Sequence, residues 1–327
     1  MELLKTAESR GRENLMTILS SNCFEDGSKE VGQFWYIIQT RPYMRILHNM
    51  ARISVEGKAY DKAVETVIEM LRLCEADNIG IREWLASLLI RVGRFEDALS
   101  FAQVWIDPRR PDIVPRGGCH FKPPSSQPLT AVKMSHMPSP WLRACFLYDA
   151  ALAAFKLWGD CKLARQYLLL AAKQNPIILV KIMAKTAQQK TLNNSSRAMN
   201  SPEDASDYLW LAQDLWMDPE VWTWAQSQRD VKMLLVKKCS RKGCSNVEED
   251  VAQFKRCGAC HQVWYCGRDC QKADWKEHKQ PCDEHIRYKA TMKSITDGTP
   301  MPKGMEPFMG RGDQPGIVFN HTPTSRA

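Results

Sequence analysis

The sequence predicts a mainly α protein, in which an array of helical hairpins is followed by a small cysteine-rich module. Two observations lead to this fold class. Apolar residues over the first 238 positions recur at intervals of three and four, the spacing that gathers them on one face of a helix. Seven of the twelve cysteines, in contrast, lie together between Cys239 and Cys282, in a segment too short to bury a large apolar core.

Composition narrows the class of protein further. Of the 327 residues, 44% are hydrophobic and 25% are charged, as is ordinary for a globular chain, and there is no apolar run of the roughly eighteen residues that a membrane span needs. The segment Met1–Glu13 carries several charges and lacks the apolar stretch of a secretion signal, so we expect an intracellular protein of the nucleus or cytoplasm. The net charge of +8 is too mild to indicate nucleic acid by itself.

Residues 1–106 are predicted to form helical hairpins that resemble tetratricopeptide repeats. The segment Tyr60–Val64 matches Phe95–Leu99, which begins 35 positions later. Small residues recur at intervals of 35 and 66, close to one and two units of a helical repeat of about 34 residues: Ala63, Ala98 and Ala164. A small side chain there allows the two helices of a hairpin to pack closely. Because the rest of the repeat pattern is missing, an unrelated, irregular helical domain is the alternative.

Two further stretches complete the helical part. Residues 107–140 contain eight prolines and are expected to form a long loop, because proline cannot donate a backbone hydrogen bond and interrupts helices. Helices are expected to resume over residues 141–236, with Trp141–Leu157, Lys162–Lys173 and Ile177–Gln188 as the first of them.

The later part of this helical region carries clear helix starts. Ser201 and Asp218 each precede a proline and an acidic residue, the pattern of an N-cap followed by the first helical turn. Four tryptophans cluster within fifteen residues, at Trp210, Trp216, Trp222 and Trp224. We interpret them as core rather than as an aromatic binding surface, because large aromatic side chains are mostly buried.

The cysteine-rich module contains four pairs of soft metal ligands. These pairs are Cys239 and Cys244, Cys257 and Cys260, Cys266 and Cys270, and His278 and Cys282. Two ligands a few residues apart reach one ion, and zinc takes four ligands in a tetrahedron, so eight ligands predict two Zn²⁺ ions. A shell closed by four protein ligands has no position for a water molecule, which indicates structural rather than catalytic sites.

Two other arrangements would also use these cysteines. A disulfide framework is one alternative and an iron–sulfur cluster is another, but the dense clustering in a chain expected to be intracellular, together with the single histidine, favours zinc. Spacing alone leaves open which pairs share an ion, because sequential and alternate pairing use the same number of ligands.

The run from Tyr265 to Cys282, with Gln271, Trp275 and His278 inside it, resembles the MYND-type zinc finger. The resemblance covers residues 239–282 and implies a small ββα module with a cross-brace, in which alternate pairs share an ion. One ion would then be bound by Cys239, Cys244, Cys266 and Cys270, and the other by Cys257, Cys260, His278 and Cys282.

The local sequence fits this module with two departures. Gln262–Tyr265 is β-prone and is expected to form a hairpin with the residues before Cys257, and Asp269–Lys279 has the composition of a helix. The first cysteine pair encloses four residues, where two is commoner in the family, and the connection between Cys244 and Cys257 is long. Both departures lengthen a loop and leave the ligands in place.

The resemblance implies a protein–protein interaction module. MYND fingers of this kind bind short proline-containing peptides, which add as an extended strand beside the hairpin. Trp275 stands where an aromatic face receives the proline, and Gln271 stands where a polar side chain meets the peptide backbone. Val263 and Trp264 are expected to border the groove. Packing of Trp275 against its own helix and simple solvation of Gln271 are the alternatives.

We therefore expect a non-enzymatic adaptor whose partners carry proline-containing motifs. A nucleic-acid-associated transcriptional regulator is one alternative, but the seven thiolates and two zinc ions would remove about half of the formal charge of +6 over residues 229–293. A lysine methyltransferase that combines SET and MYND domains is another, but only 45 residues follow Cys282. The tail, residues 296–327, is rich in proline and glycine and is expected to be disordered. The sequence does not indicate an oligomeric state.

Overall fold

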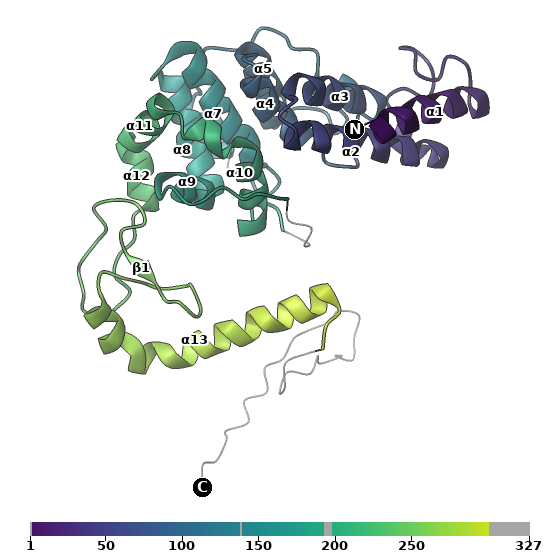
Figure 1. Ribbon diagram of the computed structural model, residues 1–327. Helices are drawn as coiled ribbons and strands as arrows, with labels where there is room; N and C mark the ends of the chain where they lie inside the picture. The colour runs from purple at the N-terminus through teal and green to yellow at the C-terminus, as the bar shows by residue number, and fades with distance from the viewer. Residues whose placement is uncertain (1, 138, 193–197, 301–327) are drawn as a thin grey trace. The chain divides into compact units, whose positions relative to one another are not determined.

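The computed structural model describes residues 2–137, 139–192 and 198–300, and the chain divides into two units, 1–235 and 236–327 (Figure 1). The described part of the first unit is built from helices, and the described part of the second combines a two-stranded hairpin with one long helix. The mainly α class predicted from the sequence is confirmed. None of the helices in the described ranges combines the length and the apolar character required to cross a bilayer.

The first half of unit one is a series of helices that pack on their neighbours along the chain. These are α1 (Glu2–Ile18), η1 (Phe34–Tyr36), η2 (Ile38–Thr40), α2 (Arg41–Glu56), α3 (Tyr60–Leu73), α4 (Arg82–Arg91) and α5 (Phe95–Ile106). Helix α2 packs against α3 and α4 packs against α5, as helical hairpins require. The segment repeated in the sequence marks the second helix of each hairpin, because Tyr60 begins α3 and Phe95 begins α5.

The second half of unit one continues in the same manner. Its helices are η3 (Pro115–Gly118), α6 (Ala131–His136), α7 (Ala144–Trp158), α8 (Lys162–Gln174), α9 (Pro176–Met183), α10 (Pro202–Trp216), α11 (Pro219–Ser227) and α12 (Arg229–Leu235). The helices expected near Trp141, Lys162 and Ile177 are present, but α7 begins three residues later than expected and α9 ends at Met183. Helices α7 and α8 form a further packed pair.

The expectation of a plain loop over residues 107–140 is wrong in part, because η3 and α6 lie within it. Helix α6 forms where the sequence is free of proline between Pro128 and Met137, and it is capped by Thr130, whose Oγ1 accepts the N–H of Lys133 at 3.2 Å. Proline therefore limits the length of the helix here without preventing it.

Close packing at the repeated alanines agrees with the reason proposed for them. The side chains of Ala63, Ala98 and Ala164 have 0% exposure. Gly93 and Gly159, five residues before the second and third of these alanines, have φ of 76° and 66°, a region in which other residues are strained. The arrangement is compatible with tetratricopeptide-like hairpins, a resemblance that stays a prediction.

The helix starts and the aromatic core of the later helices follow the sequence. Ser201 Oγ accepts the N–H of Asp204 at 3.2 Å at the start of α10, and Asp218 Oδ1 accepts the N–H of Glu220 at 3.0 Å at the start of α11. Most of the tryptophan cluster is buried, namely Trp210, Trp216 and Trp224, whereas Trp222 is partly exposed.

The second unit contains the ββα elements expected of the module. Strands β1 (Lys255–Arg256) and β2 (Trp264–Tyr265) are antiparallel, with Lys255 opposite Tyr265 and Arg256 opposite Trp264. Helix α13 (Arg268–Asp297) follows and packs on β2.

Helix α13 is longer than the sequence analysis proposed, since it continues for eighteen residues beyond Lys279. Its end lies at Gly298, which has φ of 65° and whose N–H bonds to the carbonyl of Ser294. No glycine lies between Arg268 and that point, and the helix tolerates Pro281. The start of the predicted tail at Thr296 is therefore corrected, because Thr296 and Asp297 are helical. Residues 301–327 of that tail lie outside the described residues.

Candidate metal centre

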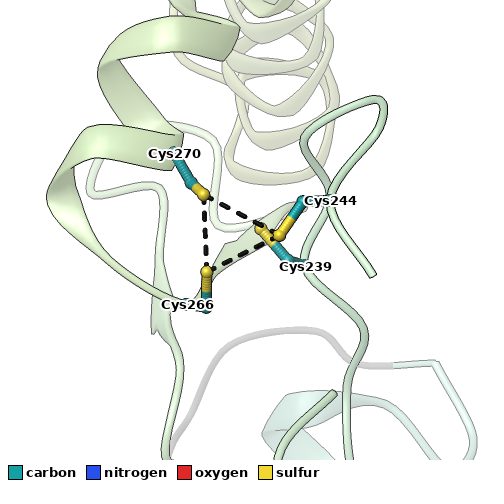
Figure 2. A group of neighbouring side chains, drawn as sticks. All are labelled: Cys239, Cys244, Cys266 and Cys270. Atoms are coloured by element: carbon teal, nitrogen blue, oxygen red, sulfur yellow. Dashed lines mark hydrogen bonds between the residues drawn. The ribbon is translucent and has the colours of Figure 1, made fainter. Parts of the chain in front are cut away.

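The first candidate site gathers four cysteines from three separate parts of the second unit (Figure 2). Cys239 and Cys244 belong to the loop after residue 238, Cys266 follows β2, and Cys270 lies in the first turn of α13. Their sulfur atoms point toward one another and lie within 4.8 Å of each other. Individual Sγ–Sγ distances are 3.8 Å from Cys244 to Cys266, 3.4 Å from Cys266 to Cys270 and 3.9 Å from Cys270 to Cys244.

The second candidate site is formed by Cys257, Cys260, His278 and Cys282, all of them buried. Cys257 directly follows β1, and His278 and Cys282 lie one turn apart on α13, so that both face the same side of that helix. The Sγ atoms of Cys257 and Cys282 are 3.8 Å apart, and Cys260 Sγ lies 3.5 Å from His278 Nε2. The imidazole thus presents its Nε2 nitrogen to the sulfurs.

These distances fit zinc. A tetrahedral zinc ion with Zn–S bonds of about 2.3 Å and Zn–N bonds of about 2.0 Å holds two sulfurs about 3.8 Å apart and a sulfur and a nitrogen about 3.5 Å apart. The measured S–S separations of 3.4–3.9 Å and the S–N separation of 3.5 Å match those edges. The donor sets, four thiols in one group and three thiols with one imidazole in the other, are those of structural zinc sites. The eight residues therefore fit two zinc ions.

The structure shows which ligand pairs share an ion, a point that the spacing of the ligands in the sequence leaves open. The first and third ligand pairs along the chain form one site and the second and fourth form the other, which is the alternate pairing of a cross-brace. The disulfide alternative does not describe the structure, because all twelve cysteines are free thiols. A disulfide would need sulfurs about 2.05 Å apart.

The electrostatics of the thiols favour a bound cation. Burial raises the pKa of Cys257, but hydrogen bonds from the backbone N–H groups of Cys260 and Ala259 and from the side chains of His278 and Cys260 together outweigh burial and lower that pKa to about 6. The neighbouring sulfur of Cys266 acts oppositely on Cys270, raising its pKa to about 12. Several thiolates in contact repel one another, and a divalent ion at their centre removes that repulsion.

Tyr265, the last residue of β2, packs against α13 and fixes the helix against the hairpin. Its side chain is only 2% exposed, its hydroxyl donates to Asp274 Oδ2 at 2.7 Å, and its ring meets the His278 ring edge-on at 6.2 Å between centroids. Burial raises the pKa of Tyr265, and Asp274 raises it further, because a carboxylate disfavours a phenolate beside it. The tyrosine thus holds the helix that supplies His278 in place.

Glu248 has a structural role that the sequence analysis missed. The carboxylate is 5% exposed and accepts two backbone N–H groups, from Lys237 at 2.8 Å and from Phe254 at 2.6 Å. Its own N–H donates to the carbonyl of Lys237 at 2.9 Å. The long connection between Cys244 and Cys257 is therefore tied to the segment that enters the finger. Glu248 stands among other acidic residues in the sequence, and nothing in that pattern indicates its structural role.

The hairpin has one closed and one open edge. The carbonyl of Val263 accepts the N–H of Cys257 at 2.9 Å, and because hydrogen-bonded pairs alternate along an antiparallel ladder, the backbone groups of Arg256 and Trp264 point outward. On the β2 side, the Trp264 carbonyl accepts the N–H of Ser240 at 2.8 Å, and the Trp264 N–H donates to Ser240 Oγ at 3.0 Å. On the β1 side, no group among the described residues bonds to the backbone of Arg256.

The residues proposed for peptide binding lie on the hairpin and on the first turns of α13. Trp275 is 42% exposed, and its ring meets the His278 ring at 6.0 Å between centroids, so the side chain is partly packed and partly accessible. Gln271 is half-buried next to the ligand Cys270. Val263 packs against the three cysteines of the second site, and Trp264 is half-buried, with the Lys237 ammonium 5.2 Å from its ring centre.

Comparison with protein families agrees with this geometry. A family model described as MYND finger matches residues 237–282. This match begins two residues before Cys239 and ends at Cys282, so it contains all eight candidate ligands. Residues 237–282 form a MYND finger. Its presence supports a role in protein–protein interaction.

Relatives among curated proteins share this finger and little else. The chain is 57% identical over 46 residues to "Histone-lysine N-methyltransferase ASHR1" of Arabidopsis thaliana, a match that covers 14% of this chain and 10% of that protein. It is 42% identical over 60 residues to "F-box protein At5g50450" of Arabidopsis thaliana, 18% of each chain. It is 38% identical over 47 residues to "MYND-type zinc finger protein samB" of Emericella nidulans, 14% of this chain and 8% of that protein.

The MYND finger thus occurs in proteins with different names, and the chain spans less than a fifth of the length of each of these relatives. No solved structure is significantly similar to the chain.

Proposed function

We propose that this protein is a non-enzymatic adaptor whose MYND finger binds short proline-containing peptides, while the helical unit offers a second interaction surface. The observation that carries the proposal is the open outer edge of β1, where the backbone N–H and carbonyl of Arg256 point away from β2. A peptide in extended conformation adds to such an edge through main-chain hydrogen bonds.

The open edge of β1 is short, which favours a short peptide as its ligand. Ser240 occupies the outward backbone groups of β2 at Trp264, and Glu248 occupies the N–H of Phe254 on β1. Arg256 remains as the one residue of the hairpin with both an outward donor and an outward acceptor among the described residues. Backbone hydrogen bonding between the peptide and β1 is therefore limited to Arg256, and side-chain contacts have to supply most of the specificity.

Trp275 is suited to supply such a contact. The exposed ring offers a flat apolar face, on which a proline ring packs well, because proline is rigid and loses little entropy on binding. Contact with His278 restrains the indole, so zinc binding also orients the residue that we propose for recognition. Gln271 offers an amide for the peptide backbone one turn earlier on α13.

The alternative hypotheses, a methyltransferase and a nucleic-acid-binding regulator, receive less support. The methyltransferase relative matches the chain over 46 residues, so its name gives no reason to assign that activity to the remaining 281 residues. Basic residues near the finger are partly used in contacts with aromatic rings, as Lys237 is with Trp264. We propose an intracellular location, in the nucleus or cytoplasm, because reduced thiols are required to bind zinc.

A peptide-binding measurement tests the proposal. The zinc-loaded full chain is titrated into a fluorescent library of proline-containing peptides, and a peptide that binds is carried forward. Replacement Trp275→Ala is expected to weaken binding about 30-fold, the effect of removing an aromatic hot spot. Tyr288→Ala is the matched control, because Tyr288 is 44% exposed on the same helix but lies outside the MYND match.

A second pair of variants tests the open edge. Arg256→Pro removes the outward N–H and should abolish strand addition, whereas Arg256→Ala keeps that N–H and should bind normally. Zinc content of two ions per chain verifies that each variant folds. Equal affinity of wild type and Trp275→Ala for every peptide that binds would refute the proposal, and so would a steep loss of binding with salt accompanied by preference for nucleic acid.

A further inference from the structure

A proline-rich segment of the first unit is held by its backbone on the surface of two helices. Residues 122–130 form neither helix nor strand, contain Pro123, Pro124 and Pro128, and have mostly exposed side chains. An exposed segment of this kind is normally loosely attached, because few apolar contacts offset its loss of conformational entropy. Here, two glutamine side chains hold it.

Each glutamine pairs with one residue of the segment through two hydrogen bonds. From α5, Gln103 Nε2 donates to the carbonyl of Ser125 at 2.8 Å and Oε1 accepts the N–H of Ser125 at 2.8 Å. From α8, Gln166 Nε2 donates to the carbonyl of Leu129 at 2.8 Å and Oε1 accepts the N–H of Leu129 at 2.7 Å. These four bonds recognise the peptide backbone and not its side chains.

Neighbouring residues surround both glutamines. Tyr167, on α8 and only 3% exposed, lines the same cavity as Gln103. Gln166 Nε2 also lies 3.2 Å from the sulfur of Met134, on α6. A primary amide whose direction is set by other contacts loses less entropy when it receives a ligand, which is the basis of preorganised binding. Both glutamine side chains are therefore already positioned to bind an extended backbone.

The segment leaves space beside it. A cavity of about 410 Å³ lies between the segment, α5, α6 and α8, and Ile106, Leu129, Val132 and Tyr167 contribute apolar lining. Lys133 and His136 lie at the same cavity. This volume falls in the range of ligand pockets, about 300–1,000 Å³. The described side chains of the segment do not fill it.

We propose that Gln103 and Gln166 form a peptide-binding site, that residues 122–130 occupy it as an internal ligand, and that an extended proline-containing peptide of a partner protein takes their place. Recognition by the backbone allows such exchange, because a foreign peptide offers the same N–H and carbonyl groups. The preferred partner carries a large apolar side chain for the cavity.

The internal ligand also makes the site regulated. A tethered segment competes at an effective concentration on the order of millimolar, so weak peptides are excluded. A partner gains the advantage by filling the cavity that the segment leaves open. This inference specifies the helical surface of the proposed adaptor and is independent of the MYND finger, which allows the two to be tested separately.

The test uses the zinc-loaded full chain with Ser125→Pro and Leu129→Pro together. Each proline removes the N–H that a glutamine accepts, and each follows a proline already, so the segment is released without a new helix conflict. A fluorescent peptide of residues 120–131 with the natural sequence is then titrated, and anisotropy is measured. We expect binding to this released variant and at least tenfold weaker binding to the wild type.

Matched variants locate the binding. Gln103→Ala with Gln166→Ala, in the released chain, should abolish binding of the peptide, whereas Trp275→Ala should not change it, because that residue belongs to the finger. A peptide with N-methylated Leu129 should not bind, and a peptide with Gln127→Leu should bind several-fold more tightly by entering the cavity. Equal affinity of this last peptide would refute the cavity as part of the site.

Three results would overturn the proposal. The first is the absence of peptide binding to a released variant that keeps its helical circular dichroism and two zinc ions. The second is binding that survives loss of both glutamines. The third is a wild-type dimer in light scattering that dissociates when Ser125→Pro and Leu129→Pro are introduced. That dimer would assign the face to exchange of segments between two copies of this chain.

Discussion

Removal of zinc by a strong chelator is expected to unfold the described residues of the second unit and to leave the first unit folded. Within the described part of the finger, Tyr265 is the only apolar side chain, apart from the cysteine ligands, that is almost fully buried. Burying one such side chain contributes roughly 2–3 kcal/mol. Ordering a single residue costs about 1.5 kcal/mol, so this core cannot order a module of some sixty residues.

Zinc supplies the missing free energy. Structural sites of this type contribute about 10–16 kcal/mol of apparent binding energy at neutral pH. Once the metal is removed, the part of α13 beyond Cys282 becomes an isolated helix of about fifteen residues, which is marginal in water. Helix α13 should therefore unfold together with the hairpin, whereas the buried core of the first unit contains none of the eight metal ligands.

Limited proteolysis with mass spectrometry, combined with circular dichroism, measures this outcome. After chelation, new cleavage sites should fall within residues 236–300 and none within the helices of the first unit. Cys257→Ala should lower the zinc content from two ions to one per chain, and Cys119→Ala, which removes a cysteine outside both sites, should leave it at two. A finger that resists proteolysis after its metal is shown by elemental analysis to be gone would refute this reasoning.

Three further predictions concern buried groups. Burial raises the pKa of Asp149 from 3.8 to about 7, so the folded state keeps a proton that the unfolded state releases, and stability is lost as the pH rises from about 4 to 7. Asp149→Asn should remove a slope of about 1.4 kcal/mol per pH unit from urea denaturation between pH 5 and 6; an unchanged slope would contradict this. Gly117→Ala should destabilise the first unit by roughly 1–3 kcal/mol, because φ is 59° there and the added Cβ would lie 2.7 Å from Cβ of Leu71; an unchanged melting temperature would be the contrary result. Glu248→Ala leaves two backbone N–H groups without their acceptor and should weaken zinc retention against a competing chelator by roughly 1–3 kcal/mol, whereas equal retention would show that the loop is held by other contacts.

Local sequence information was sufficient for the main helices of the first unit and for the identity of the metal ligands. The helical period of apolar residues and the caps at Ser201 and Asp218 depend on neighbours within a few positions, and the helices begin where those signals lie. Helix α13 extends beyond the range expected from the sequence, because the residues after the last ligands contain no glycine that would end the helix before Gly298.

The chemistry of the metal sites was also local, because two ligands a few residues apart reach one ion whatever the rest of the chain does. Which pairs share an ion was different. Alternate and sequential pairing satisfy the same ligand count, so only a family resemblance favoured the cross-brace before the tertiary structure showed it.

Tertiary structure alone decided the contacts between residues distant in the sequence. Ser240 closes one edge of the hairpin from 24 positions away, and Gln166 holds Leu129 from 37 positions away. Neither residue stands out in the sequence, because a serine or glutamine is ordinary at a surface and a backbone hydrogen bond requires no particular partner side chain. Helical periodicity and ligand spacing depend only on residues close together in the sequence. The open edge of the finger and the occupied site on the helices depend on residues that come together only when the chain folds.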